Sequence, residues 1–261
     1  MIYYVSRVFP VLAKSIAERA VDRMKKIVCD NYEDVCGSAA DIFTHQLKIK
    51  PESVLGLATG STPIGLYEEL VKRFKSGEID FSKAVSFNLD EYYPIDPAHP
   101  QSYDHFMRKH LFDGINIRKF SIPNGAAADA VAECKRYESE LSDTYGIDLM
   151  LLGIGVNGHI GFNEPAVSYM TETHQVDLTK SSIDANSRFF KSGEHQPTKA
   201  LTMGLGQIFR SKKILLLITG TAKAEIAKKL FDGQIHTDVP ACLLLLHPDV
   251  TVILDKAANG G

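Results

Sequence analysis

A glycine-rich segment in the middle of the chain holds side chains that could transfer protons. Residues 153–165 read Gly-Ile-Gly-Val-Asn-Gly-His-Ile-Gly-Phe-Asn-Glu-Pro and follow an apolar run that predicts a buried strand. Asn157, His159 and Glu164 lie in this segment, and a histidine near a carboxylate suits general acid–base catalysis. Ligands of open α/β sheets bind outside the carboxyl ends of the strands. The pattern therefore indicates a proton-transfer site, with a purely structural histidine as the alternative.

A second candidate is the pair of adjacent carboxylates Asp90 and Glu91, which follows another predicted strand in Phe-Asn-Leu-Asp-Glu-Tyr-Tyr. Neighbouring residues of an extended segment point to opposite sides, so we expect only one of the two to face a cleft. An ionised aspartate can accept a proton, and a pocket that excludes water would make it more basic. The alternative is a solvated acidic turn.

A third candidate is the loop Thr-Gly-Ser-Thr-Pro at residues 59–63, between a predicted strand and a predicted helix. We expect Thr62 to be the N-cap and Pro63 the first helical residue. Gly60 would let the backbone approach a ligand, and free amides with the Thr59, Ser61 and Thr62 hydroxyls would form a phosphate cradle. The loop lacks the Gly-Lys-Ser/Thr of nucleoside triphosphate sites, and an ordinary strand–helix turn is the alternative.

Two isolated cations could add to such an anion site. Arg188 lies in Ala-Asn-Ser-Arg-Phe-Phe, and Lys223 follows a predicted strand in Thr-Gly-Thr-Ala-Lys. Either side chain could bind a phosphate, and a solvated surface charge is the alternative for each.

The glycine-rich segment also matches the dinucleotide pattern Gly-x-Gly-x-x-Gly, with Asp177 about 20 residues further on. We exclude that interpretation because Gly161 and Pro165 fall where the required helix would run. A zinc site is not expected either, since the nearest histidine to His159 is His174, which is not at ligand spacing. The sequence thus predicts neither a metal nor a redox cofactor.

Strand and helix patterns alternate along the chain. The predicted strands are Lys26–Cys29, Val54–Ala58, Ala84–Leu89, Ile147–Gly153, Lys213–Thr219 and Val250–Leu254. Amphipathic helices are predicted over residues 32–48, 65–76, 127–145 and 222–231. This alternation predicts a single α/β domain whose open parallel sheet carries helices on both faces. The polar residues 168–199 predict an active-site lid or, as the alternative, a surface excursion.

Composition limits the remaining possibilities. The chain has 261 residues and a formal net charge of −3, which gives no general electrostatic case for binding nucleic acid or an anionic membrane. No apolar run approaches the roughly 20 residues of a membrane span. Four scattered cysteines without Cys-x-x-Cys spacing predict reduced thiols in a cytoplasmic protein.

The first strand is predicted to open near Met24, so residues 1–23 are predicted to be an extension outside the domain of residues 24–261. Deleting residues 1–23 should leave the thermal midpoint and the activity unchanged, because the extension would contribute nothing to the core. A large loss of either quantity would contradict this assignment.

Taken together, these segments resemble the glucosamine-6-phosphate deaminase family. The resemblance runs from about Met24 to the C-terminus and rests on several motifs in the same order. They are Leu-Ala-Thr-Gly-Ser-Thr-Pro, Phe-Asn-Leu-Asp-Glu-Tyr, the glycine-rich segment through Asn-Glu-Pro, Ala-Asn-Ser-Arg-Phe-Phe and Ala-Leu-Thr-Met-Gly. It implies a modified Rossmann-like fold and the conversion of glucosamine 6-phosphate and water to fructose 6-phosphate and ammonia.

The resemblance also implies roles. His159 would assist opening of the pyranose ring, with Glu164 and Asn157 orienting and polarising it. Asp90 would be the base that moves a proton from the amine-bearing carbon to the anomeric carbon, before ammonia leaves. The positions that match the family's phosphate-binding residues are Gly60, Ser61, Thr62, Arg188 and Lys223.

Two departures from the family pattern matter. Asn157 stands where some members have aspartate, so it can orient His159 by hydrogen bond but cannot share its charge. Val167, His174 and Val176 stand where allosteric members bind an activator phosphate. We therefore expect a non-allosteric enzyme that is a monomer or a low-order oligomer. A sugar-phosphate lactonase or isomerase, or a non-catalytic sugar-phosphate sensor, is the alternative function.

Overall fold

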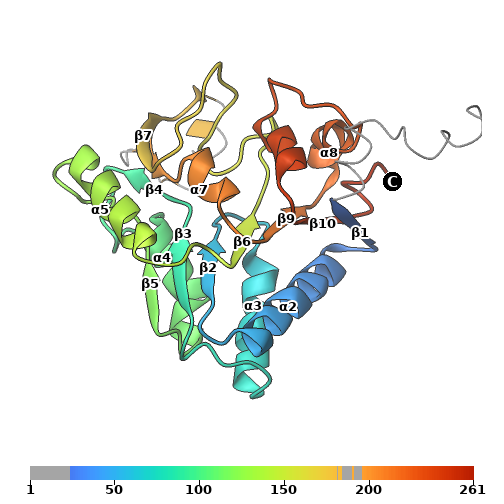
Figure 1. The fold of residues 1–261 in the computed structure, drawn as a ribbon, viewed down its shortest axis with the longest axis horizontal. Helices are drawn as coiled ribbons and strands as arrows, with labels where there is room; N and C mark the ends of the chain where they lie inside the picture. The colour runs from blue at the N-terminus through green and yellow to red at the C-terminus, as the bar shows by residue number, and fades with distance from the viewer. Residues whose placement is uncertain (1–23, 181, 184–189, 191–195) are drawn as a thin grey trace, which may run out of the picture.

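A parallel sheet forms the centre of the computed structural model, which describes residues 24–180, 182–183, 190 and 196–261 (Figure 1). In these residues seven strands lie in the order β1-β10-β9-β6-β2-β3-β5, and each neighbouring pair is parallel. Their bounds are β1 Lys25–Cys29, β2 Val54–Leu57, β3 Val85–Asn88, β5 Lys119–Ser121, β6 Leu149–Leu152, β9 Ile214–Ile218 and β10 Val250–Asp255. Every residue of β2, β6 and β9 is buried, as expected for strands covered on both faces.

The order in which successive strands are added across the sheet changes direction once. From β1 the chain proceeds to β2, β3 and β5, and it then returns to β6, β9 and β10 on the other side. Crossovers between parallel strands are right-handed, so the helices of the two halves cover opposite faces. Figure 1 shows α2 and α3 on one side of the strands and α5, α7 and α8 on the other. The reversal falls between the neighbouring strands β2 and β6, where a ligand site is expected.

The helices begin where the local sequence supplies a cap. Asn31, Ser102 and Asp129 each accept a backbone N–H in the first turn of α2, α4 and α5, respectively. The helix bounds are α2 Tyr32–Ile49, α3 Ile64–Lys75, α4 Tyr103–His110, α5 Ala130–Ser142, α7 Leu205–Phe209 and α8 Ala224–Leu230. Short 3₁₀ turns are η1 Phe112–Gly114, η2 Thr221–Lys223 and η3 Pro240–Leu246. None of the helices in the described parts of the chain has the length and apolar character that crossing a bilayer requires.

A second, antiparallel sheet was not expected from the sequence. It contains β4 (Asp90–Tyr93), β8 (Lys199–Thr202) and β7 (His174–Asp177) in the order β4-β8-β7. Each strand has only four residues, which is too short for a clear alternation of polar and apolar residues. Asp90 begins β4 and pairs with Thr202 of β8, so the chain changes sheets directly after β3.

The predicted fold class is confirmed, with local corrections. All six predicted strands are present, with ends that differ by up to two residues, but the three-residue strand β5 was missed. The apolar residues 241–246 belong to the 3₁₀ turn η3. No helix follows Gly158, where turns run instead, which confirms the exclusion of a dinucleotide loop. Part of the polar segment 168–199 pairs as β7, whereas Arg188 lies outside the described residues.

Candidate active site

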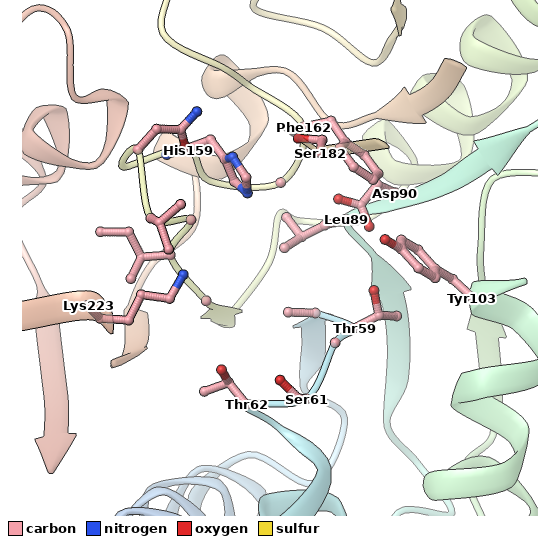
Figure 2. A pocket seen from close by; sticks show the side chains of 18 residues that line it. Thr59, Ser61, Thr62, Leu89, Asp90, Tyr103, His159, Phe162, Ser182 and Lys223 are labelled. Atoms are coloured by element: carbon pink, nitrogen blue, oxygen red, sulfur yellow. Dashed lines mark hydrogen bonds between the residues drawn. The ribbon is translucent and has the colours of Figure 1, made fainter. Parts of the chain in front are cut away.

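The loops at the carboxyl ends of four neighbouring strands, β9, β6, β2 and β3, enclose a cavity of about 320 Å³ (Figure 2). Its polar side chains are Thr59, Ser61, Thr62, Asp90, Tyr103, Asn157, His159, Ser182 and Lys223. Three residues that the sequence predicted for the site contribute no described side chain to the cavity wall. Gly60 lines the wall with its backbone, Glu164 lies behind His159, and Arg188 is outside the described residues. The fold thus brings candidate residues from distant segments to one cavity.

The loop between β2 and α3 is fixed by a phenol from α2. The Tyr32 hydroxyl donates to the carbonyl oxygen of Thr62 (3.0 Å) and accepts the N–H of Gly65 (2.9 Å). Gly65 is in the first turn of α3, so Tyr32 acts where a side-chain N-cap would. The predicted N-cap, Thr62, is therefore wrong: Pro63 holds that position, and it has no side-chain cap hydrogen bond. The Thr62 hydroxyl faces the cavity instead (Figure 2).

This side of the cavity is suited to an anion. The first turn of α3 contains no acidic residue, and Gly60 has a φ of 99°, a conformation that favours glycine. Figure 2 shows Lys223 across the cavity from Ser61 and Thr62. Burial lowers the pKa of Lys223, and no described residue forms a salt bridge with it. A helix N-terminus opposite an unpaired ammonium group is a favourable place for a phosphate.

On the opposite wall, the imidazole ring of His159 lies against the carboxylate of Glu164. The imidazole Nδ1 lies 3.1 Å from Glu164 Oε1, although the ring N–H is not aligned with that oxygen, so the contact is chiefly electrostatic. Burial raises the pKa of Glu164, but His159 and the hydrogen bonds from Ser182 and Asn157 outweigh it and bring the pKa to about 2. Glu164 is therefore ionised and can stabilise a positive charge on the imidazole ring.

Asn157 joins the two partners of this pair. Its Nδ2 donates to Glu164 Oε2 (2.6 Å), and its Oδ1 accepts the backbone N–H of His159 (3.3 Å). An aspartate here would place a second carboxylate against Glu164, whereas the amide donates a hydrogen bond to it. Asn157 therefore contacts both the carboxylate of Glu164 and the backbone of His159.

Sequence reasoning missed two hydroxyls that also contact Glu164. Ser182 Oγ donates to Glu164 Oε1 (2.6 Å), and Thr179 Oγ1 lies 3.3 Å from the same oxygen. Both residues belong to the polar segment 168–199. Serine and threonine are frequent in such segments, so no feature of the sequence distinguished these two.

The absence of a side chain on Gly155 leaves room for the imidazole ring of His159. A Cβ atom placed on Gly155 would lie 2.5 Å from ring atoms of His159, closer than real Cβ contacts come. Gly161, with a φ of 57°, lies near the other candidate, because its Cβ would be 3.0 Å from Thr202 Oγ1 and 3.4 Å from Asp90 Oδ2. These two glycines are required by the site and not only by the turn.

Asp90 and Glu91 separate as their alternation predicted. Asp90 faces the cavity, and burial alone raises its pKa to about 7. Glu91 points away from the cavity and accepts three backbone N–H groups. A carboxyl group that titrates near neutral pH can both accept and return a proton at that pH, as a general base should.

Tyr103 is a further cavity residue that sequence reasoning missed. It is the first residue of α4, and Figure 2 shows its hydroxyl directed toward Asp90. The N-cap Ser102 was a usable signal for the start of this helix, but no local pattern indicated that the helix begins at the cavity. In the described residues no three His, Cys, Asp or Glu side chains group as metal ligands do.

The fold and the cavity together define an α/β enzyme that acts on a small molecule. Residues 30–253 match the family described as glucosamine-6-phosphate isomerases/6-phosphogluconolactonase. The chain belongs to this family.

Individual relatives add detail. A glucosamine-6-phosphate deaminase of Thermoanaerobacter pseudethanolicus is 56% identical over 237 residues, which are 90% of this chain and 94% of the relative. A Clostridium botulinum glucosamine-6-phosphate deaminase is 51% identical and covers 90% of this chain and 97% of its own. The solved structure of a monomeric glucosamine-6-phosphate deaminase has a TM-score of 0.88 and 45% identity, covering 91% of this chain and 99% of that one. The 6-phosphogluconolactonase of Trypanosoma brucei, with a TM-score of 0.75, 16% identity and coverage of 91% and 98%, shares the fold.

Replacing Gly155 with alanine should move the His159 ring away from Glu164, because the added methyl group occupies the ring's position. The His159 ring resonances in an NMR spectrum should shift strongly. Gly153→Ala is the matched control in the same loop, since its Cβ would have no neighbour within 4 Å. Unchanged His159 resonances in Gly155→Ala, or equal changes in both variants, would contradict the geometry.

Proposed function

We propose that this protein is a glucosamine-6-phosphate deaminase, which converts glucosamine 6-phosphate and water to fructose 6-phosphate and ammonia. One observation carries the proposal. A buried carboxyl group with a pKa of about 7, Asp90, shares a cavity with the His159–Glu164 pair and with a loop suited to phosphate. Relatives named as this enzyme, at 51% and 56% identity over 90% of the chain, support it.

The phosphate would bind between the loop after β2 and Lys223. Thr59, Ser61 and Thr62 supply hydroxyl donors, Gly60 allows close approach of the backbone, and the α3 N-terminus favours a negative charge. Arg188 is proposed as a further ligand from the sequence alone. Binding energy at the phosphate is remote from the reacting carbons and can orient the sugar for reaction.

Ring opening is assigned to His159. Figure 2 shows its ring extending into the cavity, and its Nδ1 lies 3.1 Å from Glu164 Oε1. The imidazole takes the proton of the anomeric hydroxyl and passes it to the ring oxygen as the bond between that oxygen and the anomeric carbon breaks. Glu164 stabilises the imidazolium that forms, and Asn157 holds Glu164 and the His159 backbone together.

Asp90 then acts on the open-chain sugar. Its carboxylate removes the proton from the amine-bearing carbon and returns it to the anomeric carbon. One proton also moves from the amine nitrogen to the aldehyde oxygen, and the aldose becomes the ketose imine. Water adds to the imine to give a carbinolamine, which loses ammonia and leaves fructose 6-phosphate. No step transfers electrons to or from a cofactor, so the residues of the cavity suffice for the chemistry. A general base in such a step contributes about 10²–10⁴-fold to the rate.

We further propose that the enzyme works without allosteric activation, as a monomer in the cytoplasm. The solved relative is a monomeric enzyme, and two of the three positions that match an activator phosphate site, Val167 and Val176, carry no side-chain donor. The cysteines are free and buried, which suits a reducing compartment.

Incubation with glucosamine 6-phosphate should release ammonia with hyperbolic kinetics, and glucosamine without its phosphate should react far more slowly because it loses the orienting contacts. N-acetylglucosamine 6-phosphate should not activate the reaction. Folded protein that releases no ammonia would reject the deaminase assignment, and sigmoidal kinetics relieved by this compound would reject the non-allosteric one.

Asp90→Asn should lower kcat by about 10²–10⁴-fold while substrate still binds, because the amide cannot take the proton. In the wild type, kcat should fall as the pH drops through about 7, where Asp90 becomes protonated. Burial raises the pKa of Asp90 from 3.8 to about 7, so the fold loses stability as the pH rises from the first value to the second. Asp90→Asn should therefore raise the thermal midpoint at pH 8, where the whole loss is present, and raise it less at pH 5. Near-wild-type turnover in this variant would remove Asp90 from the mechanism.

A further inference from the structure

The carboxylate of Glu91 is bound by the chain at the start of α4. Its Oε1 accepts the N–H of Tyr92 and of Tyr103, each at 2.8 Å, and its Oε2 accepts the N–H of Asp104 at 2.9 Å. Glu91 is only 1% exposed, and no described cation forms a salt bridge with it. Burial raises the pKa of Glu91 to about 8 against the opposing effect of these backbone donors, two of which lie in the first turn of a helix, so the donors chiefly hold the carboxyl group in place. One side chain thus joins β4, which carries Asp90, to α4, which carries Tyr103.

The Tyr103 ring is enclosed by aromatic neighbours. It stacks on Phe162 with an interplanar angle of 3° and a centroid distance of 6.2 Å, and it packs against Tyr92 at 4.8 Å. The hydroxyls of Tyr92 and Tyr103 also lie close enough to affect each other's pKa. With the ring fixed on two sides and its backbone bound to Glu91, the Tyr103 hydroxyl has a defined position in the cavity wall.

Asp90 has the opposite character. Its backbone is fixed by the β4–β8 pairing, but no described residue donates a hydrogen bond to its carboxylate. Proton transfer requires one carboxylate oxygen to point at the reacting carbon, and free rotation about the last bond of the side chain would reduce the fraction that does so. Figure 2 shows the Tyr103 hydroxyl directed at this carboxyl group, so the donor that could stop the rotation is already in place.

We propose that Tyr103 is a positioning residue for Asp90, and that Glu91 places it by binding the first turn of α4. The inference rests on the proposed function, because it assigns a partner to the proposed base. With substrate bound and water displaced, the Tyr103 hydroxyl donates to one oxygen of Asp90, and the other oxygen receives the proton from the amine-bearing carbon.

The test compares wild type, Tyr103→Phe, Glu91→Gln and Tyr93→Phe by ammonia release from glucosamine 6-phosphate across a range of pH. Tyr93→Phe is the matched control. Tyr93 also belongs to β4, but its hydroxyl donates to the carbonyl oxygen of Ala127 outside the cavity. Tyr103→Phe should lower kcat about ten- to a hundredfold, as expected for losing a hydrogen bond to a charged group, with KM nearly unchanged. The decline of kcat at low pH should begin at a higher pH in Tyr103→Phe, because ionised Asp90 has lost a donor.

Glu91→Gln keeps the size of the side chain but sets an amide NH₂ against a backbone N–H, so it should loosen the first turn of α4 and reproduce the kinetic defect of Tyr103→Phe. In the double variant Tyr103→Phe/Glu91→Gln, kcat should fall by less than the product of the two single losses, because both substitutions act through the same hydroxyl.

Three outcomes would overturn the inference. Tyr103→Phe with the kcat and pH profile of Tyr93→Phe would remove Tyr103 from the reaction, and a raised KM with unchanged kcat would make it a substrate-binding residue only. A Glu91→Gln chain that does not fold would make Glu91 a structural residue. A folded wild type that releases no ammonia would instead reject the proposed function, and the role of Tyr103 with it.

Discussion

The burial of the Asp90 carboxyl group without a hydrogen-bond donor is the constraint on which the site depends. Such a group costs free energy when ionised, and this cost raises its pKa to about 7. The fold has to hold the residue there against that cost. The β4–β8 pairing fixes its backbone, Gly161 leaves space for the side chain, and Glu91 joins its strand to α4. Loosening any of these would let water reach the carboxylate and reduce its basicity.

The cavity sets two carboxylates to opposite states. Glu164 is also largely buried, but an imidazole, an amide and a serine hydroxyl surround it, and its pKa falls to about 2. None of the described residues gives Asp90 such a partner, and burial raises its pKa to about 7. Two carboxyl groups whose environments push their pKa values apart are a recurrent basis for dividing acid–base roles. Here the carboxylate with the lowered pKa lies against an imidazole ring, and the carboxyl group with the raised pKa faces the cavity.

The phosphate side of the cavity illustrates how a distant residue can replace a local motif. The sequence predicted Thr62 as the helix cap, because threonine before Pro and Ile-Gly is a common start. In the fold, Tyr32 of α2 takes the N–H of Gly65 and leaves Thr62 to face the cavity. The helix is capped without using the loop's own hydroxyls, which stay available to a ligand.

The sequence predicted the six longer parallel strands because buried strands are continuous apolar runs, and that signal is local. It also indicated Asp90, His159 and the loop 59–62, because reactive side chains at glycine-rich strand ends can be recognised from neighbouring residues. It did not reveal β4, β7 and β8, whose four-residue strands are stabilised by pairing with distant segments. Nor did it reveal Tyr103 or Ser182, whose roles arise from contacts across the cavity.

The sequence by itself thus determined which residues could do the chemistry and the order of the elements that carry them. Only the tertiary structure decided which of Asp90 and Glu91 faces the cavity and what Asn157 contacts. It also decided that Tyr103 lines the cavity and that Tyr32 fixes the loop after β2. The physical reason is that pKa values and side-chain positions depend on burial and on partners far away in the chain, which are set when the sheet and its helices pack together.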